Sequence, residues 1–284
     1  MWDYQIETLC RWARLGADGF RCDVASAVPV EFWKAARQAV AQVKSDAVWL
    51  AESVHGSFVR DLRSRGHYCA SDGELYDAFD ITYDYDIFPR FEAVFEGTGS
   101  IVQYLEALIS QESTYPANYL KLHFLENHDQ RRAASYLKDP QMRRMWTAFF
   151  WCVKGVGLIY NGQEVLAEHT PSLFEREPID WRTSPETQAY CELLRLLTEI
   201  KRLPAVRSGI YKLEAVGPDC STAVVSYEAG AQRLYGVFSL SLAHSQARLP
   251  LADGVYRNLA GGEVCVTDGV LSCGAEPVII SVSD

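Results

Sequence analysis

Apolar residues recur at helical spacing at the start of the chain. In residues 4–15, Ile6, Leu9 and Ala13 fall on one side of a helix, and a glycine follows at a suitable stop. The next run, residues 19–25, is short and apolar before it ends in polar residues, which is typical of a buried strand. The chain therefore opens with a predicted helix followed by a predicted strand.

The same alternation then repeats. Pro29 precedes a helical pattern in residues 30–43, and residues 47–52 form a second short apolar run. Helix, strand, helix, strand is the order expected of an α/β fold with a parallel sheet. Further along we expect helices near 57–65, 88–96, 100–111, 140–153 and 185–202, a strand within 76–86, and strands at 119–127 and 155–162. The clear strands number about four, which is half of an eight-stranded barrel.

The pattern changes past Pro204. Short β-prone runs broken by glycines follow, at 222–229, 232–240, 247–251, 264–269 and 277–282. They predict a small antiparallel β domain. We therefore divide the chain into residues 1–203, a partial (β/α)8 barrel, and residues 204–284, the β domain.

Composition excludes some partners. The chain has 284 residues and a formal net charge of -10, so it has no basic surface to neutralise phosphates, and we expect no nucleic-acid or membrane partner. No apolar run approaches the roughly 18 residues of a membrane span, and the N-terminus lacks a signal pattern. The eight cysteines are scattered without zinc-site spacing, which favours a reducing compartment. Cytoplasmic is the default location.

Three predicted strands end in carboxylates. Asp23 closes the first apolar run, Glu52 closes the second, and Asp129 follows the strand at 119–127. In parallel α/β sheets the carboxyl ends of strands form the site face. Cleaving a glycosidic bond needs one carboxylate to attack the anomeric carbon and a protonated one to donate to the leaving oxygen. The structural alternatives are that Asp23 and Asp129 are helix N-caps and that Glu52 is a solvated or ion-paired group.

Three motifs, in order, carry a resemblance. They are GFRCD, with Arg21 two residues before Asp23, WLAE, which ends at Glu52, and FLENHD, which ends at Asp129. Their order and spacing resemble the second to fourth signature regions of the α-amylase family, glycoside hydrolase family 13. The resemblance implies a (β/α)8 TIM barrel followed by a small antiparallel β-sandwich domain. This chain would hold about strands 4 to 8 of that barrel, with the N-terminal strands missing.

The resemblance also implies roles for these residues. Asp23 would be the nucleophile that forms a covalent glycosyl intermediate, with Arg21 orienting its carboxylate. Glu52 would protonate the leaving oxygen and then deprotonate water. Asp129 would be a third site carboxylate that, with His128, holds sugar hydroxyls and favours the distorted ring.

The chain departs from the family pattern in three places. No Asp followed four and five residues later by Asn-His precedes Asp23, so the family's first signature is missing. Residues 24–29 replace the Lys-His that follows the nucleophile in many members. Many members also have a tryptophan two residues after the acid/base, and we expect His55 to take part of its space and to contact substrate.

The implied function is a retaining glycoside hydrolase of the α-amylase type, acting on starch, other α-1,4-glucans or malto-oligosaccharides. One alternative is a transglycosylase or isomerase of the same family, for example of the trehalose synthase type. Another is a non-catalytic carbohydrate-binding or interaction relative, although three retained carboxylates argue against it.

The partial barrel sets the expected partners and cofactors. Half a barrel exposes strand edges and apolar interior, so we expect little activity from this chain alone and a separately encoded N-terminal half as a partner. The run from Tyr76 to Asp86 is rich in oxygen ligands. A polar strand and loop is nevertheless the favoured interpretation. No metal and no cofactor are predicted, with calcium an option only in a complete parent.

Overall fold

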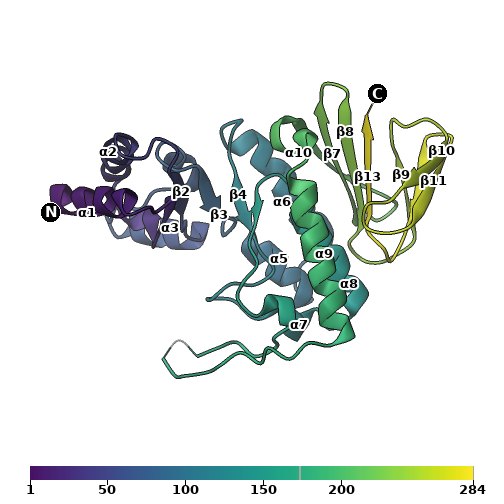
Figure 1. The fold of residues 1–284 in the computed structure, drawn as a ribbon, viewed down its shortest axis with the longest axis horizontal. Coiled ribbons are helices and arrows are strands. Elements are labelled where there is room, and N and C mark those ends of the chain that lie inside the picture. Colours follow the sequence, from purple (N-terminus) through teal and green to yellow (C-terminus); the bar gives the residue numbers. More distant parts are fainter. Residues whose placement is uncertain (173, 284) are drawn as a thin grey trace. The chain divides into compact units, whose positions relative to one another are not determined.

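The polypeptide folds into two compact units. The computed structural model describes residues 1–172 and 174–283. Unit 1 consists of Met1–Ala93 with Ser110–Leu122, and unit 2 consists of Val94–Ile109 with His123–Asp284. Figure 1 shows the order of helices and strands along the chain. Residue 284, the last of the predicted β domain, lies outside the described residues.

Unit 1 is built on parallel strands. Strand β1 (Gly19–Cys22) pairs with β2 (Val48–Ala51), β2 pairs with β3 (Ile81–Tyr83), and β3 pairs with β4 (Lys121–His123). The strands are connected by α1 (Trp2–Arg14), the 3-10 turn η1 (Ala25–Ala27), α2 (Val30–Ala41), α3 (Gly56–Ser64) and α4 (Asp72–Leu75). The helices α5 (Phe88–Phe95) and α6 (Ile101–Thr114) contribute residues to both units.

Apolar side chains of strand and helix form the core of unit 1. Trp33 of α2 and Trp49 of β2 both pack edge-on against Phe79, with ring centroids 5.3 and 6.2 Å apart. The predicted apolar face of the first helix is confirmed, because Ala13 is buried and Leu9 packs against the same cluster. Burial of these aromatic rings helps to hold α2 on the sheet.

Unit 2 contains the last barrel strand and its helices. Its elements are α7 (Ala133–Tyr136), α8 (Pro140–Cys152), β5 (Val156–Gly157), the 3-10 turn η2 (Gln163–Val165), α9 (Pro185–Lys201) and α10 (Pro204–Ser208). The amide of Leu158, just past β5, donates to the carbonyl of His123 at the end of β4 (2.9 Å). Strand β5 thus follows β4 in the order β1-β2-β3-β4-β5.

The rest of unit 2 consists of two antiparallel sheets. One has the order β13-β8-β7-β6 and the other β10-β11-β12-β9. Their strands are β6 (Ile210–Val216), β7 (Thr222–Ala229), β8 (Gln232–Ser239), β9 (Ser245–Arg248), β10 (Gly254–Arg257), β11 (Glu263–Thr267), β12 (Val270–Cys273) and β13 (Val278–Ser283). Val237 and Ile280 of one sheet join Leu271 of the other in a single apolar cluster. Alternating apolar residues thus form the core between the sheets.

Helix α8 joins the two parts of unit 2. Phe149 packs against Phe238 of β8 at 5.6 Å between ring centroids. Arg144 donates to the carboxylate of Glu276 at 3.0 Å and to the carbonyl of Ala260 at 2.5 Å. These contacts fix the β sheets to a helix of the barrel portion (Figure 1).

The predicted fold class is confirmed. Five parallel strands are present, as expected for about strands 4 to 8 of the barrel, and the strand with the weakest apolar signal, β3, lies inside the stretch at 76–86. The predicted division at residues 203 and 204 stays a prediction. None of the described helices has the length and apolar character to cross a membrane.

Candidate active site

One guanidinium connects two of the three predicted carboxylates. Strands β1 and β2 pair in parallel up to Cys22 and Ala51, so the residues that follow them emerge at the same edge of the sheet. Nη1 of Arg21 lies 2.5 Å from Oδ1 of Asp23, and Nη2 lies 2.8 Å from Oε1 of Glu52. Arg21 is thus shared between the predicted nucleophile and the predicted acid/base.

The two carboxylates differ sharply in exposure. The side chain of Asp23 is 80% exposed, whereas that of Glu52 is 10% exposed. The second oxygen of Glu52, Oε2, accepts the backbone N–H of Val24 at 2.7 Å. Glu52 is therefore fixed by a donor on each oxygen, and Asp23 leaves most of its surface open to an incoming ligand.

The side chain of Arg21 also contacts Tyr83 of β3. Its Nε donates to the hydroxyl of Tyr83 at 3.4 Å, and its guanidinium lies 5.5 Å from the centre of that ring. Burial by itself lowers the pKa of Arg21, but the hydrogen bonds to Tyr83 and Asp23 and the charge of Glu52 outweigh it and raise the pKa. Arg21 therefore remains a cation beside Asp23.

His55 is held against a tyrosine of the same unit. Its Nδ1 lies 3.0 Å from the carbonyl oxygen of Tyr85, and the two rings lie 4.7 Å apart between centroids. The hydrogen bond to a carbonyl requires the proton on Nδ1, which leaves Nε2 as an acceptor in the neutral ring. A fixed ring packed against a tyrosine suits contact with a sugar face, and the assignment of His55 to substrate binding stays a prediction.

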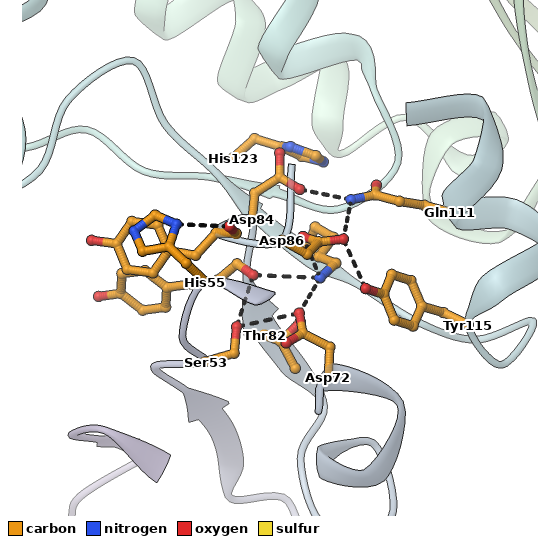
Figure 2. Close-up of polar contacts among 12 residues, drawn as sticks. Ser53, His55, Asp72, Thr82, Asp84, Asp86, Gln111, Tyr115 and His123 are labelled. Atoms are coloured by element: carbon orange, nitrogen blue, oxygen red, sulfur yellow. Dashed lines mark hydrogen bonds and ion pairs between the residues drawn. The ribbon is translucent and has the colours of Figure 1, made fainter. Parts of the chain in front are cut away.

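A buried ionic cluster, which the sequence motifs did not reveal, contacts the residue next to Glu52. The ammonium of Lys121, at the start of β4, pairs with Asp72 and with Oδ1 of Asp86, the latter at 2.9 Å. Ser53, the neighbour of Glu52, donates to the carbonyl of Tyr83 at 3.0 Å and to Asp72 at 3.3 Å (Figure 2). The strand end that carries Glu52 is thereby hydrogen-bonded to the cluster.

The outer side of this cluster is also satisfied. The hydroxyl of Tyr115 donates to Asp86 at 2.7 Å, and the amide of Gln111 donates to Asp86 at 3.0 Å and to Asp84 at 2.9 Å (Figure 2). The Tyr/Asp-rich stretch is thus a polar strand and loop in which the neutralising charge for Asp86 is Lys121. A lysine inside the apolar run at 119–127 was the available sequence signal, because a buried cation needs counterions.

The other two predicted site residues lie in unit 2. Nε2 of His128 lies 3.2 Å from Oδ2 of Asp129, and the two side chains are 42% and 40% exposed. The backbone N–H of Asp129 donates to the side-chain oxygen of Asn127 at 2.9 Å. This local turn presents both side chains at the end of the loop that follows β4.

A buried ion pair closes that loop. Glu126 and Arg132 are each 1% exposed and lie 2.7 Å apart. Glu126 also accepts the N–H of Ala133 at 2.6 Å, and Arg132 donates to the carbonyl of Asn161 at 2.9 Å. Residues 126 and 132 therefore fix both ends of the segment that carries Asp129.

Neither predicted aspartate acts as a helix cap, which answers the structural alternative. The N-cap of η1 is Val24 and that of α7 is Arg132, and neither position uses a side-chain cap. Asp23 pairs with Arg21 instead, and Asp129 pairs with His128. The two strand-end aspartates are thus available to a ligand.

Comparison with known proteins places this chain. The model of the alpha amylase catalytic domain matches residues 3–192. The chain belongs to the α-amylase family. A second family model, the bacterial alpha amylase C-terminal domain, matches residues 214–280. The resemblance seen in the three motifs is thereby confirmed for the family.

Relatives of this α-amylase family chain are known by sequence and structure. A crystal structure of an alpha-amylase from Lactobacillus plantarum is 39% identical, with a TM-score of 0.90 over 99% of this chain and 66% of that one. The noncanonic maltogenic alpha-amylase AmyB from Thermotoga neapolitana is 28% identical, with a TM-score of 0.81 over 100% of this chain and 66% of that one. Alpha-amylase 2 of Dictyoglomus thermophilum is 26% identical over 222 residues, which are 74% of this chain and 37% of the relative. The chain thus spans less than two thirds of these proteins.

Proposed function

We propose that this chain carries the nucleophile and the acid/base of a retaining α-glucan hydrolase. The main support for this proposal is that the guanidinium of Arg21 bridges Asp23 and Glu52 at the ends of neighbouring parallel strands. Asp23 attacks the anomeric carbon while Glu52 gives its proton to the leaving oxygen, and a glycosyl-Asp23 ester forms. Glu52 then takes a proton from water, which attacks the ester and releases Asp23 and the sugar.

The exposure of the two side chains supports this division of roles. A nucleophile must reach the anomeric carbon, and Asp23 is largely exposed with an ionised partner on one oxygen only. An acid/base must be fixed relative to it, and Glu52 is nearly buried and held through both oxygens. Arg21 aligns the nucleophile through a charge-assisted hydrogen bond.

The proposed substrates are α-1,4-glucans and malto-oligosaccharides. Support comes from the names of the relatives, an alpha-amylase and a maltogenic alpha-amylase among them. His128 and Asp129 are proposed to hold sugar hydroxyls, since both are half-exposed side chains on a loop closed by a buried ion pair. His55, whose ring packs against Tyr85, is proposed to contact a sugar ring.

The test is turnover of maltotriose and maltopentaose by purified protein mixed with a separate chain that carries the first half of an amylase barrel, with products followed by NMR of the newly formed anomer. The variants Asp23→Asn and Glu52→Gln should lose turnover on the order of 10³-fold or more. Asp46→Asn is the matched control, because Asp46 is an exposed aspartate paired with Lys44. Full turnover by either site variant contradicts the proposal, and longer products in place of hydrolysis identify a transglycosylase.

We further propose that the free edge of β1 receives a strand-and-helix unit from the first half of an amylase barrel on a separate chain. In the sheet order, β1 is the terminal strand. Beside it lies a largely apolar cavity of about 420 Å³, lined by residues that include Leu9, Phe20, Val28 and Phe32. A parallel strand edge next to an apolar cavity suits another β/α unit of the same kind.

The partner proposal is tested by mixing this chain with the N-terminal third of the Lactobacillus plantarum enzyme and measuring sedimentation and turnover. We expect a one-to-one complex and a gain of turnover over the chain alone. Leu9→Asp, in the cavity, should abolish the complex, whereas Leu15→Asp, on an exposed side chain, should not. Robust starch hydrolysis by the chain alone, or no complex with unmodified protein, contradicts the proposal.

A further inference from the structure

The residue that follows Asp23 has a strained backbone. Val24 has φ 40° and ψ 45°, in the left-handed region. Five non-glycine residues have positive φ in the described part of the chain, and Val24 is the β-branched one. A β-branched side chain in this region is a true outlier, and such strain gathers at functional sites.

Packing of the valine side chain does not account for this conformation. Val24 is 37% exposed, so its side chain is not part of the buried core. The gain lies in the backbone instead. With this geometry the N–H of Val24 donates to Oε2 of Glu52 at 2.7 Å, and the N–H of Ala25 donates to the carbonyl of Glu52 at 3.0 Å.

We propose that Val24 is a positioning residue for the proposed Asp23 and Glu52 pair, acting through its backbone N–H. This inference rests on the proposed function. The terminal torsion of a glutamate is broad, so a single partner leaves its carboxylate free to rotate. With Arg21 on Oε1 and Val24 on Oε2, both oxygens are fixed.

Val24 directly follows the proposed nucleophile in the chain, so its contact with Glu52 affects the position of both carboxylates. Because Val24 is bonded to Asp23, one turn sets the place of the nucleophile and also holds the acid/base. A geometric error of about 1 Å between such groups costs on the order of 10²-fold in rate. The strain is therefore the cost of a direct link between two strand ends.

The proposal separates the backbone of residue 24 from its side chain. Val24→Gly and Val24→Asn keep the N–H and tolerate the left-handed region, so both should retain kcat within about threefold. Replacing the Val24 N–H by an ester oxygen, through the hydroxy-acid analogue of valine, should lower kcat about tenfold or more with KM nearly unchanged. The matched control is the same ester at Val28, whose N–H donates to the carbonyl of Ala25 in the same turn.

Amide hydrogen exchange tests the contact without any need for turnover. In Glu52→Ala the Val24 amide should exchange about tenfold faster than in the unmodified chain, while the Val28 amide should be unchanged. An amide at Val24 that ignores Glu52, or an ester at 24 that keeps full kcat, overturns the inference.

The two proposals fail in different ways. If the unmodified chain has no turnover but Val24 exchange depends on Glu52, the positioning contact stands and the hydrolase proposal is what needs revision. If turnover depends on Asp23 and Glu52 but the Val24 ester behaves like the Val28 ester, the hydrolase proposal stands and Val24 is merely a strained turn.

Discussion

The buried cluster around Lys121 permits a sharp test, because its two carboxylates should respond differently to the same substitution. Lys121 is fully buried between Asp72, which is 5% exposed, and Asp86, which is 19% exposed. One cation cannot fully neutralise two carboxylates. Asp72→Asn and Asp86→Asn each replace a carboxyl group by a neutral amide with almost no change in shape.

The structure indicates which carboxylate is the counterion. Burial raises the pKa of Asp72, and Asp86 raises it further against the effect of Lys121. Burial also acts to raise the pKa of Asp86, but Lys121, Tyr115 and Gln111 outweigh it and lower the pKa. Burial alone would lower the pKa of Lys121, yet the two aspartates raise it well above its usual value. The ionised pair is therefore Lys121 and Asp86.

The expected costs follow from this assignment. Asp86→Asn leaves a buried ammonium without its main counterion, which costs about 3–5 kcal/mol in the free energy of unfolding. Asp72→Asn keeps the Lys121–Asp86 pair and removes a carboxylate that burial disfavours, so it should cost about 1 kcal/mol. The pH dependence has a definite sign. Because the folded pKa of Asp86 is lowered, its contribution is present above pH ~4 and is lost as the pH falls through the folded pKa.

The assay is hydrogen exchange of the β2 and β3 amides in increasing urea, which reports on unit 1 alone. Unmodified protein, both asparagine variants and the exposed control Asp46→Asn are compared at pH 7 and pH 3.5. We expect the deficit of Asp86→Asn to shrink at the lower pH. If Asp72→Asn costs as much as Asp86→Asn at pH 7, the assignment of the counterion is wrong.

Three further predictions concern single positions. In Gly19→Ala the new Cβ would lie 2.3 Å from the carbonyl oxygen of Val48, so β1 and β2 must separate, and urea unfolding should show a loss of about 1–3 kcal/mol. Arg132→Met leaves Glu126 buried without its partner and should cost about 3–5 kcal/mol, whereas adding Glu126→Leu should recover part of that loss in a double-mutant cycle. Burial lowers the pKa of Lys201 to about 8, so between pH 8 and about 10.4 the folded chain binds fewer protons than the unfolded chain. In urea unfolding, the stability of unmodified protein relative to Lys201→Met should therefore rise with pH across that window. A difference in stability that does not change with pH contradicts this prediction.

The sequence by itself determined the order of elements and the identity of the chemistry. Apolar runs that end in Asp23 and Glu52 predict strands that end in carboxylates, because the buried part of a strand requires apolar residues and its solvent-accessible end tolerates polar ones. The helices between these strands were also predicted from short stretches of sequence. These features were visible because hydrophobic periodicity and strand-end position each depend on a few neighbouring residues.

Only the tertiary structure decided how those carboxylates are held. The contact from Arg21 to Glu52 depends on the register of β1 against β2. Lys121 contacts Asp72 and Asp86, which lie on other parts of the fold. The left-handed turn at Val24 contains no glycine that would have indicated it in the sequence. The partners of buried charges and the conformations of strained turns depend on packing between segments that are distant in the chain. Local sequence patterns do not predict which of these segments pack together.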